Sequence, residues 1–305
     1  MNRASKRIAT LLVFVFLLSF SLLAEAKSPL VLQTDFGLKD GAVSAMQGVA
    51  VGVDPDIRVF NLTHEIPAYN IWEASYRLMQ TAPYWPAGTV FVSVVDPGVG
   101  TERKSIVLKT QTGHYFVTPD NGTLTLIAEK MGIAEVRQID ENTNRLSGSN
   151  ESYTFFGRDV YAYTGARLAA GVIDFEQVGP RLLTDIIRIP YQKSAVKGST
   201  AIGTIPILDI QYGNVWTNIN KTTLDSLQLR PGDMLQVEIF NQGKAVYKGK
   251  MPFVNTFGDV PDGKPLAYYN SLMDLSFALN MDSFSSVNKV FSGPEWSVKV
   301  EKINR

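Results

Sequence analysis

The chain has 305 residues, of which 29 are Lys or Arg and 29 are Asp or Glu, so its formal net charge is zero. It contains no cysteine and only two histidines, His64 and His114. Disulfides, zinc–thiolate sites and thiol catalysis are therefore excluded, and an imidazole-based site could use only these two histidines. The balanced charge, with no basic run beyond the N-terminus, disfavours nucleic acid as a partner.

The first 26 residues have the pattern of an export signal. Residues 2–7 carry three positive charges, and residues 8–23 form an apolar run interrupted only by small hydroxyl residues. Ala24-Glu25-Ala26 then supplies small residues two positions apart, as a signal peptidase requires. We expect a signal peptide over 1–26, cleavage after Ala26, and a periplasmic or secreted protein. An uncleaved anchor is the alternative, because the apolar run is borderline for a membrane span.

From residue 29 the pattern alternates strands and helices, which is typical of an α/β fold. The sequence predicts strands at 29–32, 57–62, 89–95, 105–109 and 114–118, and helices at 40–53, 69–81, 124–131 and 160–170. After residue 190 the segments become short and β-rich, at 201–208, 214–219, 234–240, 245–254 and 266–270. We therefore expect an N-terminal α/β domain (27–192) with a mostly parallel sheet, and a smaller C-terminal β-barrel or sandwich domain (199–305).

Two of the predicted strands are followed directly by an acidic turn. Asp35 follows the first strand, and the stretch from Asp96 to Arg103 follows the third. If these strands are parallel, both acids lie at the carboxyl edge of the sheet, where open α/β folds bind ligands. Asp35 is then either a turn aspartate or an acceptor for two ribose hydroxyls. Asp96 and Arg103 could meet across their Gly-rich turn, where the alternative is a surface ion pair of small energetic value.

Three further stretches carry polar or aromatic side chains suited to a ligand site. Residues 155–159, Phe-Phe-Gly-Arg-Asp, open a predicted helix, although a capping Asp with a paired Arg explains the pattern equally well. Residues 209–219 place Asp, Asn and aromatic side chains on one turn and strand. Asn270, Ser271 and Asn280 flank a segment that could be a short helix. The residues alone thus indicate an acid-rich, aromatic-lined cleft for a polar ligand carrying a ribose.

Taken together in this order, the motifs resemble one family over residues 29 to 285. They are Thr34-Asp35-Phe36-Gly37 with Asp40, Thr63-His64-Glu65-Ile66-Pro67, Asp96-Pro97-Gly98-Val99-Gly100-Thr101 with Arg103, Pro119-Asp120-Asn121-Gly122, Gly157-Arg158-Asp159, Gly213-Asn214-Val215-Trp216-Thr217-Asn218 and Asn270-Ser271. The chain resembles the S-adenosylmethionine hydroxide adenosyltransferases, the adenosine-forming S-adenosylmethionine hydrolases, whose relatives are the fluorinating and chlorinating enzymes. The resemblance implies attack of water on the ribose C5′ carbon, giving adenosine and L-methionine, without metal or cofactor.

The resemblance also implies roles for individual residues. Asp96 and Arg103 would hold the water, and Asp35 would hold the ribose hydroxyls. Asp40, Asp209 and Ser271 would address the methionine ammonium or carboxylate, with Asn214 near the adenine or the amino-acid part. The walls of the cleft would be Tyr69, Phe155, Tyr212 and Phe257, with Gly157 and Asn280 also in the substrate site. The family forms homotrimers with the site between subunits, and this is expected here.

Two positions depart from the family pattern. Where the hydrolases carry a water-holding His directly before Gly157, this chain has Phe156, which has no hydrogen-bonding atom. Where the fluorinating enzymes carry an Arg for the substrate carboxylate, this chain has Leu272. A slow hydrolase, or one of altered substrate, is therefore the leading hypothesis. The alternatives are an exported, non-catalytic nucleoside-binding protein and a halogenating enzyme, and Asp96, which the halogenating relatives lack, disfavours the second.

Overall fold

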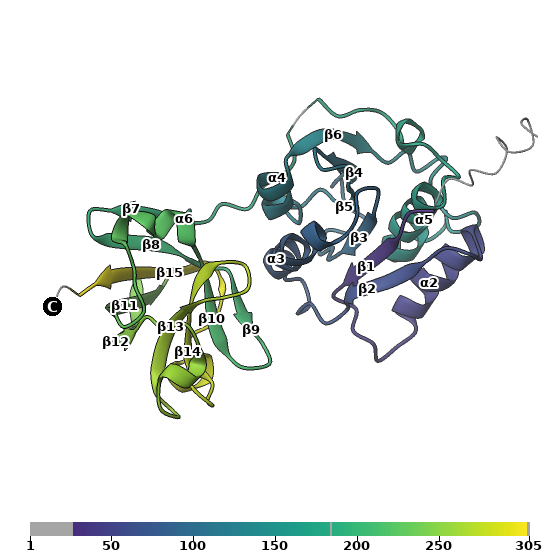
Figure 1. Cartoon of the computed structure of the whole chain (residues 1–305). Helices are drawn as coiled ribbons and strands as arrows, with labels where there is room; N and C mark the ends of the chain where they lie inside the picture. The colour runs from purple at the N-terminus through teal and green to yellow at the C-terminus, as the bar shows by residue number, and fades with distance from the viewer. Residues whose placement is uncertain (1–26, 184, 304–305) are drawn as a thin grey trace, which may run out of the picture.

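The computed structural model describes residues 27–183 and 185–303, and the predicted signal peptide lies outside them. Two parts of the chain, each built around its own sheet system, lie side by side (Figure 1). Among the described residues no helix is long and apolar enough to cross a membrane.

The N-terminal part is a six-stranded mixed sheet covered by helices on both faces. Its strands are β1 (Leu30–Thr34), β2 (Val59–Thr63), β3 (Val90–Val94), β4 (Ser105–Thr110), β5 (Tyr115–Pro119) and β6 (Ile133–Gln138), in the order β2-β1-β3-β5-β4-β6. The pairs β1–β2, β1–β3 and β3–β5 are parallel, whereas β4 pairs antiparallel with β5 and β6. The predicted mostly parallel sheet is confirmed, with β6 added to the predicted strands.

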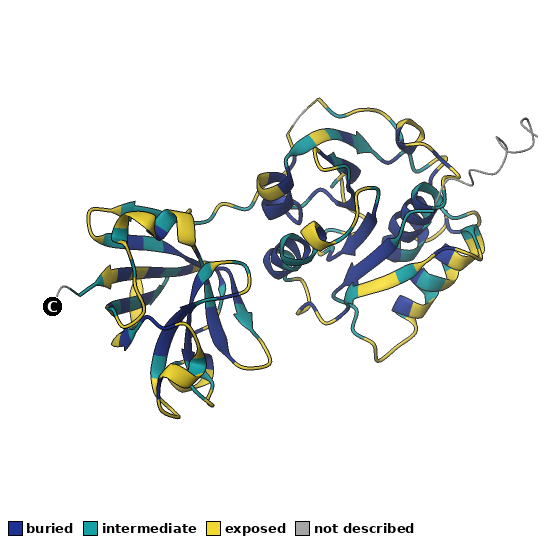
Figure 2. Ribbon diagram, viewed as in Figure 1, coloured by how far each residue is buried: buried dark blue, intermediate teal, exposed yellow. Residues whose placement is uncertain are grey.

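Alternating side chains of the central strands pack into separate cores on the two faces of this sheet. Leu30 and Val92 face α2 (Ala42–Val53) and α5 (Tyr163–Ala169), whereas Val31 and Phe91 face α3 (Ile71–Thr81) and α4 (Thr125–Met131). Helices on both faces explain why β1 and β3 are continuous apolar runs rather than alternating ones. Figure 2 shows these strands as buried throughout.

The C-terminal part consists of two antiparallel sheets packed on a common core. The first has the order β13-β14-β10-β9, and the second β12-β11-β15-β8-β7. The strands are β7 (Ala195–Lys197), β8 (Thr200–Ile205), β9 (Ile207–Asp209), β10 (Asn214–Asn220), β11 (Met234–Asn241), β12 (Lys244–Pro252), β13 (Pro265–Tyr269), β14 (Asp274–Leu279) and β15 (Gly293–Lys302). The short helices α6 (Lys221–Leu224) and α7 (Phe284–Asn288) lie between them in sequence. This confirms the antiparallel β architecture expected for the C-terminal part.

One expectation for this part is wrong. The segment between Ser271 and Asn280 is strand β14, not a short helix, and it pairs with β10 and β13. Its Leu275 and Phe277 are fully buried in the core between the two sheets. Pairing on both sides therefore overrides the helix-compatible composition of the segment.

The two parts meet along helix α3. The indole N–H of Trp72 donates to the backbone carbonyl of Pro206, and the guanidinium of Arg77 donates to that of Leu208. Around Trp72, Tyr76 and Ile207 form a small apolar cluster that spans the junction. These contacts fix β9, and the turn that follows it, against the N-terminal part.

Candidate active site

A cavity of about 420 Å³ opens at the carboxyl ends of β1 and β3, where the two acidic turns were predicted to meet. Its lining residues are Asp35, Phe36, Asp40, Ala42, Ala68, Tyr69, Val94, Asp96, Val99, Thr154, Phe155, Phe156 and Gly157. Because β1 and β3 are adjacent parallel strands, Asp35 and Asp96 leave the sheet at the same edge. The cavity thus combines three carboxylates with an aromatic wall.

Asp35 is tied to the opposite rim of this cavity. Its Oδ2 accepts a 2.8 Å hydrogen bond from the backbone N–H of Tyr69. Tyr69 has a φ of +69°, a left-handed conformation that is uncommon for a residue with a side chain, and the residue is 73% exposed. The bond to Asp35 holds this strained residue at the rim, and strain of this kind concentrates at functional sites. Asp40 lies nearby, with Oδ1 accepting from the N–H of Ala42 at the start of α2.

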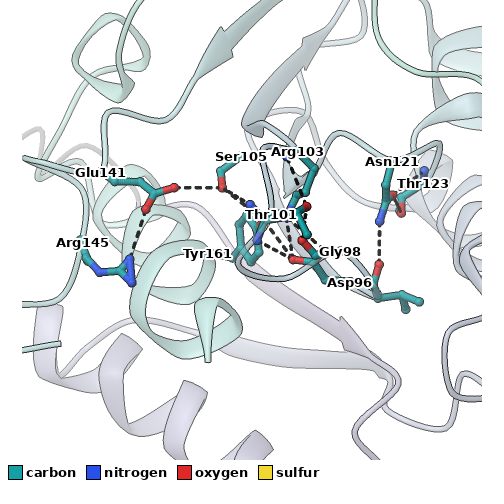
Figure 3. Close-up of polar contacts among 11 residues, drawn as sticks. Asp96, Gly98, Thr101, Arg103, Ser105, Asn121, Thr123, Glu141, Arg145 and Tyr161 are labelled. Carbon is teal, nitrogen blue, oxygen red and sulfur yellow. Dashed lines mark hydrogen bonds and ion pairs between the residues drawn. The ribbon is translucent and has the colours of Figure 1, made fainter. Parts of the chain in front are cut away.

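Asp96 and Arg103 form a bidentate ion pair across the predicted turn (Figure 3). Arg103 Nε lies 3.1 Å from Oδ1 and 3.0 Å from Oδ2 of Asp96, and Nη2 lies 2.7 Å from Oδ2. The side chains are only 9% and 5% exposed, so this is not the weak surface pair of the alternative interpretation. Burial is the largest single influence and would lower the pKa of Arg103, but the hydrogen bond to Asp96 and the charges of Asp96, Tyr161 and Glu141 together outweigh it, so the pKa is raised. Arg103 lies behind Asp96 rather than on the cavity wall.

Phe156 lies on the wall of the cavity and is 5% exposed. Its ring contacts two guanidinium groups, with the Cζ atoms of Arg103 and Arg145 each 4.7 Å from its centroid. The ring therefore packs against Arg103 of the Asp96–Arg103 pair by a cation–π contact, and it contributes no polar atom to the cavity. Its neighbour Phe155 packs edge-on against Phe36.

Two local features place these aromatic residues and the end of β3. Gly157 begins a π-helical turn, Gly157–Ala162, and a Cβ here would lie 3.1 Å from the ring of Phe36. Asn121 donates from Nδ2 to the carbonyl of Val95 at 2.8 Å, while its Oδ1 accepts from Thr123 (Figure 3). The residue preceding Asp96 is therefore fixed by a side chain from the Pro119-Asp120-Asn121-Gly122 motif.

The remaining predicted site residues line a second cavity, of about 860 Å³, in the C-terminal part. Its lining residues are Asp209, Ile210, Gln211, Tyr212, Gly213, Asn214, Trp216, Phe257, Tyr268, Asn270, Ser271, Leu279, Asn280, Met281, Asp282, Ser283 and Ser286. Asn214 is buried and donates to Oδ2 of Asp209 at 3.2 Å. The Nδ2 of Asn270, a lining residue, is buried and has no hydrogen-bond partner among the described residues, so its donor capacity is unused in the structure.

The structure divides the predicted site residues into two groups. Asp35, Asp40, Tyr69, Asp96, Phe155, Phe156 and Gly157 line the first cavity, and Asp209, Tyr212, Asn214, Phe257, Ser271 and Asn280 line the second. The two cavities share no lining residue among those the structure describes. Asn280 has a partly structural role, since its Nδ2 donates to the carbonyl of Val260.

Several residues of these cavities were not anticipated. Tyr268 is an example in the second cavity, and burial raises its pKa to about 12. Behind Asp96, the hydroxyl of the fully buried Tyr161 lies 3.4 Å from Oδ2. No sequence signal separates this tyrosine from an ordinary core residue, because its polar partners come from strand ends far away in the chain.

Among the described residues, neither histidine lines either of these two cavities. His64 is buried between Thr34 Oγ1 and Asn61 Oδ1, each 2.9 Å from a ring nitrogen, and burial lowers its pKa. His114 is held by Thr112 and by the carbonyl of Trp85. Within residues 27–183 and 185–303, no cluster of three or more His, Asp or Glu side chains is arranged to hold a metal ion.

Comparison with known proteins identifies the family. Residues 30–179 match the model of the SAM hydroxide adenosyltransferase N-terminal domain, and residues 203–297 match that of the C-terminal domain. The chain belongs to the SAM hydroxide adenosyltransferase family. Both cavities lie within the matched residues, so the family assignment covers the whole candidate site.

Individual members of the family are similar over most of the chain. The (R)-S-adenosyl-L-methionine hydrolase of Methanocaldococcus jannaschii is 36% identical over 231 residues, which is 74% of this chain and 79% of that protein. The fluorinase of Actinoplanes sp. is 28% identical, covering 81% of this chain and 89% of that protein. The crystal structure of an uncharacterized conserved protein from Thermotoga maritima is 35% identical, with a TM-score of 0.80, covering 89% of this chain and 99% of that one.

Proposed function

We propose that this protein hydrolyses S-adenosyl-L-methionine to adenosine and L-methionine. The observation that carries the proposal is the buried Asp96–Arg103 pair, which presents a carboxylate to the same cavity that Asp35 lines. Family relatives that share at least a third of their residues with this chain over most of its length are named (R)-S-adenosyl-L-methionine hydrolase. Asp35 would then hold the ribose hydroxyls and Asp96 the attacking water.

In the proposed reaction the water oxygen bonds to C5′ as the bond from C5′ to sulfur breaks. The bonding pair moves to sulfur, so methionine leaves as a neutral thioether and needs no added electrophile. The enzyme must mainly align water opposite sulfur and exclude other solvent, and Tyr69 and Phe155 supply apolar surface for this. Because the substrate already carries its leaving group as a cation, we propose that no cofactor takes part.

We further propose that the complete site forms between subunits of a homotrimer. The supporting observation is that the proposed nucleoside and methionine groups are divided between two cavities with no common lining residue among those described. The rims of both cavities carry exposed apolar side chains, including Tyr69 (73%) and Met281 (85%). Exposed apolar side chains gathered at a cavity rim are typical of an interface.

In the second cavity, Asp209 would address the methionine ammonium, and Ser271 with the free donor of Asn270 its carboxylate. Leu272 offers no cation for this carboxylate, so binding there would depend on neutral hydrogen-bond donors. The proposed place of action is outside the cytoplasm, as the N-terminal 26 residues indicate. Mass spectrometry of the exported protein tests this, because cleavage after Ala26 leaves Lys27 at its N-terminus.

One assay tests the proposed activity against the alternatives. The protein without residues 1–26 is incubated with each sulfonium epimer of S-adenosylmethionine, with and without chloride, and the products are separated by chromatography. Adenosine and methionine in equal amounts support the proposal. A 5′-chloro-5′-deoxyadenosine product contradicts it, and tight adenosine binding without any product supports the nucleoside-binding alternative.

The subunit arrangement is tested by mixing two inactive variants. Asp96→Asn damages the first cavity and Asp209→Asn the second, so co-assembled trimers contain some sites with both halves intact. If sites form between subunits, a 1:1 mixture regains about one quarter of the parent activity. If each site lies within one chain, the mixture stays inactive.

A further inference from the structure

A chain of hydrogen-bonding side-chain oxygens leads from Asp96 into the protein interior (Figure 3). Oδ2 of Asp96 lies 3.4 Å from the hydroxyl of Tyr161, and that hydroxyl lies 3.2 Å from Oγ of Ser105. Ser105 in turn donates to Oε1 of Glu141 at 3.4 Å. Four polar groups from distant parts of the sequence thus form one continuous path.

The exposure of these side chains shows which end of the path reaches solvent. Tyr161 and Ser105 are 0% and 3% exposed, whereas the side chain of Glu141 is 35% exposed. The path therefore begins at the cavity, crosses the protein interior and ends where a proton can exchange with solvent. Burial also raises the pKa of Tyr161, so its phenol stays protonated.

The hydrogen bonds of the Ser105 hydroxyl are compatible with proton transfer from Tyr161 toward Glu141. Its hydroxyl donates to Glu141 and accepts from Nη1 of Arg103 at 3.2 Å. A second lone pair remains for the Tyr161 hydroxyl. Two arginines flank the path, Arg103 at its start and Arg145 at Oε2 of Glu141, so both terminal carboxylates are held in place.

We propose that Tyr161 is a positioning and proton-transfer residue, through which the proton of the attacking water passes from Asp96 by way of Ser105 to Glu141. This inference rests on the proposed hydrolysis. On this proposal the Tyr161 hydroxyl is the further polar group that contacts the Asp96–Arg103 pair. Phe156 also lies against the pair but has no polar atom to offer.

The step balances without any further reactant. As the bond from oxygen to C5′ forms, one proton of the water passes to the Asp96 carboxylate. In the structure the Tyr161 hydroxyl donates to Oδ2 of Asp96, so once Asp96 is protonated this O–H must turn to the free lone pair of Ser105. Asp96 then passes its proton to the oxygen of Tyr161, while Tyr161 passes its own proton to Ser105 and Ser105 passes its own to Glu141. Glu141 then releases the proton to solvent, and each hydroxyl regains its starting state by rotation.

The test compares Tyr161→Phe, which removes only the hydroxyl, with the matched control Tyr163→Phe on the same helical segment. In single-turnover hydrolysis we expect Tyr161→Phe to lower the rate about tenfold, the equivalent of one hydrogen bond to a charged group, with KM within about twofold. In mixtures of H2O and D2O, the parent and Tyr163→Phe should give a curved dependence of rate on deuterium fraction, because several protons move together. Tyr161→Phe should give a straight line.

Glu141→Gln, at the surface end of the path, provides a second variant should Tyr161→Phe fold poorly. It should lower the rate in the same direction, and the double variant should be no slower than the slower single variant. An unchanged rate in Tyr161→Phe, or a lower rate with the curvature retained, overturns the inference while leaving the proposed hydrolysis intact. A parent protein that forms no adenosine overturns the proposed function itself, and the inference with it.

Discussion

Replacing Asp96 with Asn tests whether this carboxylate takes part in the reaction or only stabilises the fold. The substitution removes the charge and keeps the shape of the side chain. The Arg103 guanidinium would remain 9% exposed with no ionised partner. Removing one member of a buried ion pair costs about 3–5 kcal/mol of unfolding free energy. Ser105 Oγ still accepts from Arg103, so we expect the lower end, about 3 kcal/mol. For a chain of this size that corresponds to a fall in Tm of roughly 6–10 °C.

The activity should fall much further than the stability. Loss of a carboxylate that orients the nucleophile and receives its proton lowers kcat by about 10²–10⁴-fold. Adenosine formation is followed by chromatography, and melting by calorimetry, on the same preparations. The matched control is Asp185→Asn, whose partner Arg188 is exposed, and both quantities should stay at the parent values. An Asp96→Asn variant with the expected lower Tm but a kcat near that of the parent would refute the catalytic role.

Three further predictions concern the walls and the domain junction. Phe156→His places a proton-accepting ring on the cavity wall, which Tyr161 does not line, and should raise kcat about tenfold in chromatographic assays; an unchanged rate would show that the path through Tyr161 already suffices. Gly157→Ala forces a Cβ to 3.1 Å from the Phe36 ring and should raise KM severalfold, whereas an unchanged KM would remove Phe36 from the substrate wall. Burial raises the pKa of Asp274 from 3.8 to about 6. Between about pH 4 and 6 the folded protein therefore keeps a proton that the unfolded chain releases, and the free energy of unfolding falls as the pH rises through this range. Asp274→Asn should remove this slope and stabilise the protein at pH 7 by at most about 3 kcal/mol, as denaturant titrations at several pH values would detect.

The edge of the parallel sheet could be predicted from sequence because its signals are local. An apolar run followed by an acid and a glycine places Asp35 and Asp96 at strand ends, whatever the rest of the chain does. The pairing of Asp96 with Arg103 also follows from a short turn whose length brings the two side chains together.

Features that depend on distant parts of the chain could not be predicted in this way. Strand β14 contains residues that also suit a helix, and only its pairing with β10 and β13 decides its conformation. Strand β15 alternates Trp296, Val298 and Val300 toward the core, a period-two signal that could have identified it. The link from Tyr161 to Asp96 spans 65 positions of sequence and joins the helical segment Gly157–Ala162 to the turn that follows β3. The division of the site between two cavities likewise appears only in three dimensions.

The most direct test of the account is the origin of the oxygen in the product. The protein without residues 1–26 is incubated with S-adenosylmethionine in H2¹⁸O, and the adenosine is analysed by mass spectrometry. Attack of water on C5′ predicts adenosine with one ¹⁸O at the 5′ position, formed together with methionine, and the label should be lost with the activity in Asp96→Asn. Adenosine without label, or no adenosine from either sulfonium epimer, would contradict the proposed hydrolysis.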